Sequence, residues 1–202
     1  MSNSRRIRLT IVAACMTAAT LTHVQAADKL ENIPLEWSPT EPLSERKPVD
    51  LTGLEAVKLQ VETFTDARDD PTSIGRSLNK APVRKVTTRT NVPRFVTYEV
   101  KALLADLGLD VVESSGTVIM NGEIRQFFAE DDTRYKATVE LRITLSDPSG
   151  KALWVVDTTG TSSRFGIAYK AANYYEVLSD ALVGAVHELA GNANFKKTLK
   201  GK

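Results

Sequence analysis

The sequence predicts an α/β (α+β) protein built as a two-layer sandwich, with a mixed β-sheet and two amphipathic helices on one face. Three patterns predict this architecture. Residues 135–146 alternate apolar and polar side chains, as a strand with one buried face requires. Residues 96–107 and 177–189 instead repeat apolar side chains every three or four positions, which is typical of helices that bury one stripe. Because each helix has only one such stripe, both should cover the same face of the sheet.

Residues 1–26 have the layout of a secretory signal peptide. Arg5, Arg6 and Arg8 precede an apolar run from Leu9 to Leu21, and a small residue, Ala26, offers a cleavage site. The run is too short to cross a bilayer as a helix of the mature protein. We therefore expect a periplasmic protein that is exported through a cleavable signal peptide.

Cys15, the only cysteine of the chain, lies inside this run and leaves a second fate open. The segment 12–15 (Val-Ala-Ala-Cys) matches the loose pattern of a lipobox, in which the cysteine is acylated and becomes the first residue of an outer-membrane lipoprotein. However, the apolar run before Cys15 would then be short, and the apolar character continues beyond it. Soluble export is favoured, and lipidation at Cys15 is the alternative.

The composition of residues 27–202 excludes several kinds of chemistry. Loss of the leader's three arginines takes Lys plus Arg from 26 to 23, against 25 Asp plus Glu, so nucleic acid is not an expected partner. The remaining chain has no cysteine and one histidine, His187, which rules out thiol nucleophiles and multi-histidine zinc sites. We expect no enzyme activity, no cofactor and no metal, and a structural role for His187.

Residues 27–53 should form a proline-rich extended arm or linker ahead of the domain. They hold half of the eight prolines, and proline removes the amide donor that sheets and helices need. Trp37 and Leu43 offer apolar anchors that would hold the arm on the domain surface. A free tether and an arm that docks on a partner are both open.

A single α/β domain is expected over residues 54–195. Residues 57–64 alternate as a strand, and a helix should begin at Asn91, with Pro93 in its first turn and Gly108 at its end. A strand after this helix would complete a right-handed crossover and pair in parallel with the first strand.

The second half of the domain should form an antiparallel meander followed by a second helix. Asp147–Gly150 has the composition of a turn between two strands. Asn173 is expected to cap the closing helix, which runs to Ala190, and residues 196–202 form a basic tail. The remaining expected strands are 109–113, 117–128, 135–146 and 152–162.

Residues 72–94 are the first candidate binding segment, because they contain six cations and no acid. Such a segment would contact lipopolysaccharide phosphates, anionic lipid headgroups or an acidic protein face. The alternative is a solvated edge, with a short strand at 83–88 whose charges prevent aggregation. The loop 164–169, with its aromatic side chains, is the second candidate. The candidate partner-binding residues are Arg76, Lys80, Arg84, Lys85, Arg89, Arg94, Arg164, Phe165 and Tyr169.

Two acidic clusters offer oxygen ligands, but neither has the spacing of a calcium loop. The first cluster follows the first strand, and the second is expected to be a solvated hairpin turn. A catalytic carboxylate pair would require a cleft between two acids, which makes an enzyme the least favoured interpretation. The clusters are Asp66, Asp69 and Asp70, and Glu130, Asp131 and Asp132.

Four segments together resemble a known family: 61–68 (VETFTDAR), 74–75 (IG), 103–108 (LLADLG) and 181–186 (ALVGAV). The pattern resembles the YajG-type bacterial envelope lipoproteins and, more distantly, the amino-terminal domain of TolB. The resemblance covers roughly residues 55–195. It implies a periplasm-facing domain of βαβ type that binds other envelope components and has no catalytic residues. Members of that family are typically lipid-anchored, whereas this leader favours ordinary cleavage.

The combined expectation is a non-enzymatic periplasmic protein that binds or scaffolds a partner in an outer-membrane or cell-envelope assembly. The partner would be an envelope protein or an anionic envelope surface, with outer-membrane association as one option. Two alternatives remain open: a carrier or sensor of a small apolar or lipid ligand between sheet and helices, and an enzyme that uses a carboxylate pair.

Overall fold

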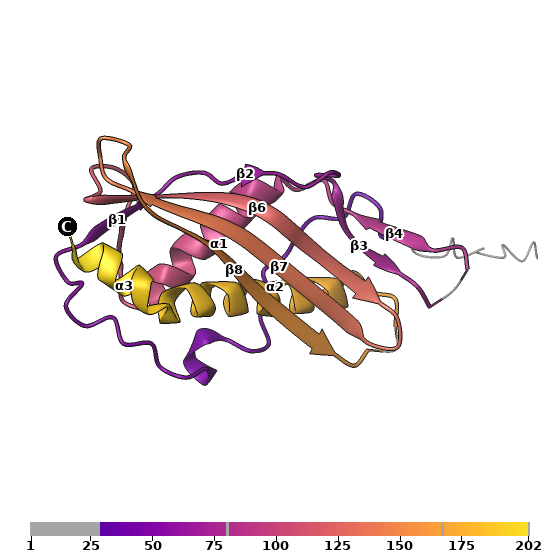
Figure 1. Ribbon diagram of the computed structural model, residues 1–202. Helices are drawn as coiled ribbons and strands as arrows, with labels where there is room; N and C mark the ends of the chain where they lie inside the picture. The colour runs from indigo at the N-terminus through magenta and orange to yellow at the C-terminus, as the bar shows by residue number, and fades with distance from the viewer. Residues whose placement is uncertain (1–28, 80, 167, 202) are drawn as a thin grey trace, which may run out of the picture.

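The computed structural model describes residues 29–79, 81–166 and 168–201 (Figure 1). The expected signal peptide, Cys15 and Lys80 therefore lie outside the described residues. Within the described part of the chain, no helix is both long and apolar enough to cross a membrane.

An eight-stranded mixed sheet is organised around its longest strand, β6. One edge of β6 pairs antiparallel with β7, which pairs in turn with β8. The other edge of β6 pairs in succession with β1, β2 and β3, all in parallel. β5 extends the sheet beyond β1, and β4 extends it beyond β3. The strands are β1 Lys58–Val61, β2 Thr65–Asp66, β3 Ser73–Ser77, β4 Arg84–Thr87, β5 Asp110–Val112, β6 Val118–Asp131, β7 Tyr135–Ser146 and β8 Ala152–Arg164.

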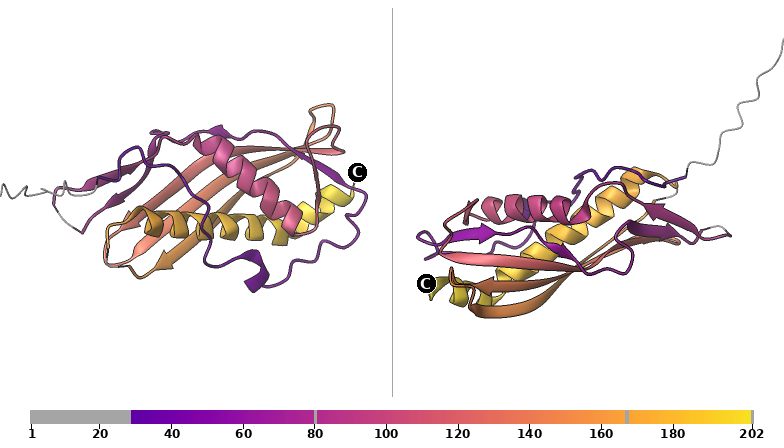
Figure 2. Two further views of the ribbon diagram at one scale, coloured as in Figure 1. Left: turned by 180° about the vertical axis from the view of Figure 1, so that it is seen from behind. Right: turned by 90° about the horizontal axis from the view of Figure 1, so that it is seen from above.

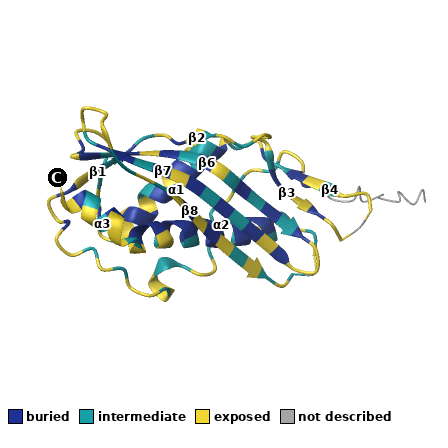
Figure 3. Ribbon diagram, viewed as in Figure 1, coloured by how far each residue is buried: buried dark blue, intermediate teal, exposed yellow. Residues whose placement is uncertain are grey.

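Helices α1 (Val92–Asp106) and α2 (Ala171–Gly191) lie on the same face of the sheet, as the sequence predicts (Figure 2). The opposite face is open to solvent, so buried and exposed residues alternate along β6 and β7 (Figure 3). This alternation places every second side chain of β7 in the core beneath the helices. The fold class expected from the sequence is confirmed, with a third helix, α3 (Ala193–Lys200), added at the end.

The backbone of α2 lies almost directly on β8. A Cβ atom at Gly160 would collide with the carbonyl of Ala181 and the amide of Ala185. The hydroxyl of Thr158 also donates to the carbonyl of Ala185, at 2.8 Å. This close contact leaves no room for a ligand between α2 and the sheet here, and thus counts against the carrier hypothesis.

Several predicted boundaries agree with the structure. β7 has the predicted limits, β8 begins at the predicted residue, and β1 and β5 form the predicted parallel pair. The side chain of Asn91 accepts from the amide of Arg94, which confirms the cap of α1. Gly108 follows this helix with φ +96°, a conformation that glycine adopts without strain.

Three local predictions are wrong. The basic segment 72–94, for which the sequence predicts no strand before residue 83, contains β3, whose burial does not alternate because Ile74 and Gly75 are both buried. The expected basic tail forms most of α3, which buries Phe195 and Leu199, four residues apart, on one side. Asn173 is inside α2 and does not cap it, because the side chain of Asn173 donates to the carbonyl of Ala168.

The amino-terminal arm is extended, apart from a 3-10 turn at Leu43–Glu45, and it lies along the domain. The amide and hydroxyl of Thr40 both donate to the buried carboxylate of Asp180 on α2, each at 2.6 Å. Farther along the arm, the ring of His187 hydrogen-bonds to the carbonyl of Lys47. This histidine therefore has the structural role expected for it, since it joins the arm to α2.

Candidate functional site

Three loops gather at one end of the sheet, on the right in Figure 1. β3 and β6 are parallel and end in register at Ser77 and Asp131. β7 begins beside the end of β8, with Tyr135 opposite Arg164. We call the hairpin end the region formed by the β3–β4 loop (78–83), Arg84 and Lys85, the β6–β7 turn (132–134), and the loop 164–169 that leads into α2.

A surface cavity of about 460 Å³ lies within the hairpin end. Asn79 and Arg84 line it from the β3–β4 side, and Phe165 and Tyr169 line it from the loop before α2. Residues more than 80 positions apart in the sequence therefore meet at this cavity. The basic segment and the aromatic loop, which the sequence identifies as separate candidates, contribute to one site.

Arg84 is held by an aromatic ring and a hydroxyl rather than by an acid. Its guanidinium carbon lies 3.7 Å from the centroid of the Tyr169 ring, and its Nη2 donates to the hydroxyl of Ser77 at 3.4 Å. Its Nε is buried without a hydrogen-bond acceptor, and no carboxylate of the described residues forms an ion pair with it. A cation over an aromatic face is stabilised by the ring, but its charge is not neutralised.

Asp131 lines the cavity, and its position in the fold differs from the prediction. The solvated turn, expected to begin at Glu130, begins two residues later, because β6 extends through Asp131. Its carboxylate is only 1% exposed, and it accepts hydrogen bonds from the hydroxyl of Ser77 and the side-chain amide of Asn79. These donors satisfy a buried charge that would otherwise be costly.

Three tyrosines pack against one another at the hairpin end, and one of them, Tyr169, lines the cavity. The ring centroid of Tyr174 lies 5.1 Å from that of Tyr135 and 6.3 Å from that of Tyr169, both with edge-to-face geometry. Burial, followed by the nearby negative charge of Asp131, raises the pKa of the Tyr174 hydroxyl well above its ordinary value. This hydroxyl stays protonated and is buried without a partner, whereas that of Tyr135 donates to the carbonyl of Ala168.

Exposed apolar side chains are concentrated at the hairpin end. Among the described residues, five large hydrophobic side chains are exposed, and three of them are Leu78, Val83 and Phe165, at 39%, 56% and 66%. The other two, Tyr98 on α1 and Val155 on β8, lie apart from this region. Exposed apolar groups that gather around a cation are a common property of interaction surfaces.

The other predicted binding residues are not brought into this cavity. Arg164 forms an ion pair with Glu176 of α2, and its Nε is buried without a partner. Arg76 lies on the open face of the sheet, where it pairs with Glu130. The side chains of Lys85, Arg89 and Arg94 are exposed on β4 and around the start of α1.

The sequence analysis did not identify Asn79, Asp131 or Tyr174 as parts of the site. A signal for Asp131 was present, since Phe127, Ala129 and Asp131 continue the inward alternation of β6. Asn79 and Tyr174 belong to the site through contacts that only the folded chain brings together.

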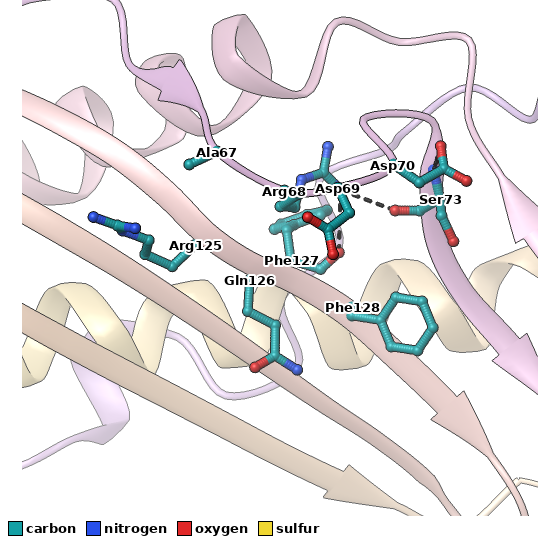
Figure 4. A pocket seen from close by; sticks show the side chains of 9 residues that line it. All are labelled: Ala67, Arg68, Asp69, Asp70, Ser73, Arg125, Gln126, Phe127 and Phe128. Atoms are coloured by element: carbon teal, nitrogen blue, oxygen red, sulfur yellow. Dashed lines mark hydrogen bonds between the residues drawn. The ribbon is translucent and has the colours of Figure 1, made fainter.

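A second cavity, of about 360 Å³, lies beside Arg68, whose guanidinium is held by neighbouring groups (Figure 4). Arg68 donates to both carboxylate oxygens of Asp66, at 2.8 and 2.7 Å. It also donates to the carbonyls of Pro71 and Ser73, at 2.7 and 2.9 Å. We call this set of contacts the Arg68 clamp. It closes the connection between β2 and β3 and thereby has a structural role.

Neither acidic cluster forms a metal site in the described residues, where no group of three or more His, Cys, Asp or Glu could hold an ion. Asp66 is occupied by Arg68, and Asp70 accepts from the hydroxyl and amide of Thr72. Asp131 is enclosed by its two donors. Asp66, Asp70 and Asp131 therefore serve the local structure through these hydrogen bonds.

No family model matches the chain. One curated relative, a serine/threonine-protein kinase, STY46, of Arabidopsis thaliana, is 30% identical over 99 residues, which cover 49% of this chain and 17% of the kinase. The match thus spans about a sixth of the kinase's length. The present chain contains neither the His-Arg-Asp nor the Asp-Phe-Gly motif of protein kinases.

One solved bacterial structure shares the fold, and others have lower similarity to it. Protein XCC0632 of Xanthomonas campestris, described as a member of DUF330, is 14% identical, with coverage of 85% of this chain and 96% of that chain and a TM-score of 0.54. A protein described as a lipoprotein, from Caulobacter crescentus, is 12% identical, with coverage of 76% and 100% and a TM-score of 0.47. A minor lipoprotein of Acinetobacter baumannii is 11% identical, with coverage of 67% and 93% and a TM-score of 0.38. At these identities the first match establishes similarity of fold alone.

Proposed function

We propose that this protein is a non-enzymatic component of the bacterial cell envelope, and that it docks onto another envelope component through its hairpin end. The observation that carries the proposal is the meeting of Arg84 with the loop 164–169 around one cavity rimmed by exposed apolar side chains. A cation without an acidic partner and an exposed Phe165 supply the charge and the apolar area that recognition of an anionic, partly apolar surface requires.

The leader and the family resemblance support the compartment. The charged and apolar segments of residues 1–26 are those of an export signal, and lipid anchoring at Cys15 remains the alternative to cleavage. The resemblance to YajG-type lipoproteins implies the same location. The carboxylates of Asp66, Asp131 and Asp180 accept hydrogen bonds from their neighbours, so the fold itself uses these three acids.

Site-specific photocrosslinking in the native host tests this proposal. A photoreactive amino acid would replace Phe165 at the hairpin end or, as the matched control, Tyr98 on α1, because the two side chains are similarly exposed at 66% and 70%. We expect adducts with envelope components from position 165 and few from position 98. The double variant R84E/K85E should remove the adducts at position 165. Equal labelling at both positions, or none at 165, would contradict the proposal.

A further inference from the structure

We infer that the hairpin end lies against a membrane surface rich in anionic lipid headgroups. This inference rests on the proposed function and names the envelope component that the hairpin end contacts. Three features of the described residues support it: the apolar side chains that project from this end, the cations among them, and the place where the amino-terminal part of the chain joins the fold.

The apolar groups project from two different loops. Leu78 and Val83 flank the β3–β4 loop, and Phe165 lies on the loop before α2. The amide of Leu78 donates to the carbonyl of Asp131, which holds the backbone of Leu78 next to the cavity that Asp131 and Phe165 line. Exposed apolar side chains of this size can enter the boundary between headgroups and acyl chains, which takes apolar groups to a depth of about 5–10 Å.

Cations outnumber acids around these apolar groups. Arg84 carries a charge without an acidic partner, and Lys85, Arg134 and Lys170 are exposed on the adjoining strand, turn and loop. The opposing exposed acids are Asp132, in the β6–β7 turn, and Glu31, near Tyr169. Asp131 is buried and accepts bonds from its two donors. A surface of this kind is attracted to the negative potential of anionic lipids.

The chain joins the fold at the same end. The carbonyl of Leu30 accepts from the amide of Thr87 at the end of β4, and Ile33 pairs with Thr88. Only residues 22–29 separate Leu30 from the apolar run that ends at Leu21, and an extended segment of that length spans at most roughly 30 Å. A membrane that holds the run in the precursor therefore lies within reach of the hairpin end. An acylated Cys15 would be separated from Leu30 by residues 16–29, which span at most roughly 50 Å.

Fluorescence quenching from within the bilayer tests the inference with the full chain. In a Cys15→Ser background, an environment-sensitive probe would be attached to a cysteine placed at Val83 or Phe165, or at the controls Tyr98 and Val155. The vesicles would contain phosphatidylglycerol and brominated lipid. We expect strong quenching at positions 83 and 165 and little at 98 and 155, even where the leader itself binds the vesicle. Equal quenching at all four positions, or none at 83 and 165, would overturn the inference.

Charge variants separate attraction to anionic lipid from simple apolar contact. We expect R84E/K85E to weaken the contact at position 165 by about tenfold at 0.1 M salt, because two attractive charges become repulsive. The control is Lys197→Glu, which changes an exposed side chain on α3 and should leave the contact at position 165 unchanged. Undiminished quenching in vesicles of phosphatidylcholine alone would contradict the requirement for anionic lipid. Protein adducts at position 165 without lipid quenching would contradict this inference alone, whereas loss of both signals would contradict the proposed function as well.

Discussion

Arg68 and Arg84 belong to the same part of the sheet, yet the fold uses the two arginines in opposite ways. Arg68 follows β2, is 7% exposed, and directs its donors to a carboxylate and to backbone carbonyls. Arg84 begins β4, rests on an aromatic ring, and has one buried donor without an acceptor. The difference teaches that a cation with all its partners in the fold is structural, whereas one without an acid is available to a partner.

The largest effect should come from the Arg68 clamp. Arg68→Met removes one member of a buried ion pair and leaves the carboxylate of Asp66 and two carbonyls without their donor. We expect a loss of about 3–5 kcal/mol in the free energy of unfolding, measured by urea denaturation of the full chain. Arg84→Met is the matched control, and an equal loss in both variants would remove the distinction between the two arginines.

The arm should give the next largest effect, since Asp180 is a second carboxylate whose partners all lie within the fold. Asp180→Ala removes the acceptor of the Thr40 hydroxyl and of the amides of Thr40 and Glu41. We expect a loss of about 2 kcal/mol in stability and faster trypsin cleavage after Arg46. Asp180→Asn keeps one acceptor oxygen and should show a smaller change. Unchanged cleavage in the alanine variant would mean that other contacts hold the arm.

Acid should weaken the Arg68 clamp. Burial raises the pKa of the Asp66 carboxyl, but the hydrogen bonds and charge of Arg68 outweigh this effect, so the pKa lies below its ordinary value. The stabilisation is therefore complete well above the unfolded pKa of about 3.9, and it is lost as the pH falls through that value toward the lower folded pKa.

Urea midpoints between pH 7 and pH 3 measure this dependence. We expect the difference between the native chain and Asp66→Asn to be largest at pH 7 and to shrink toward pH 3. Parallel curves over the whole range would show that ionisation of Asp66 does not contribute.

The smallest effects on folding should come from the hairpin end, where variants are expected to change binding instead. Arg84→Met should cost about 1 kcal/mol or less, because it removes one cation–aromatic contact and one long hydrogen bond to Ser77. Phe165→Ser should change stability by less than about 0.5 kcal/mol, since this side chain is largely exposed. Thermal unfolding measures both values. A loss above 2 kcal/mol for Phe165→Ser would assign this residue to the core and break the comparison.

Sequence patterns predicted the elements whose periodicity is local. β7 alternates over twelve residues, and α1 has both a capping residue and a terminating glycine, so their limits could be read directly. β3 could not be predicted in this way, because its five residues are held in place by β4 and β6. Its Gly75 fits there because a larger side chain would collide with the ring of Tyr174, a contact between residues 99 positions apart.

The candidate site was predicted in parts but not as a whole. Arg84 and Tyr169 were both identified, as members of two separate segments, and only the fold places one above the other. Asp131 was misread because acidic residues in a row usually indicate a solvated turn. In this protein the hydroxyl of Ser77 and the amide of Asn79 satisfy that acid, and both come from a strand and loop more than 50 positions away.

The way in which β6 shares its edge has a consequence for how such a protein can change during evolution. β1, β2 and β3 are short, and each takes its register separately from a different stretch of β6. The loops that join them can therefore lengthen or shorten without shifting the register of a neighbouring strand. The pairing of β6 with β7 can stay constant while the β3–β4 loop acquires new residues. New binding specificity can therefore arise at the hairpin end without changes in the core.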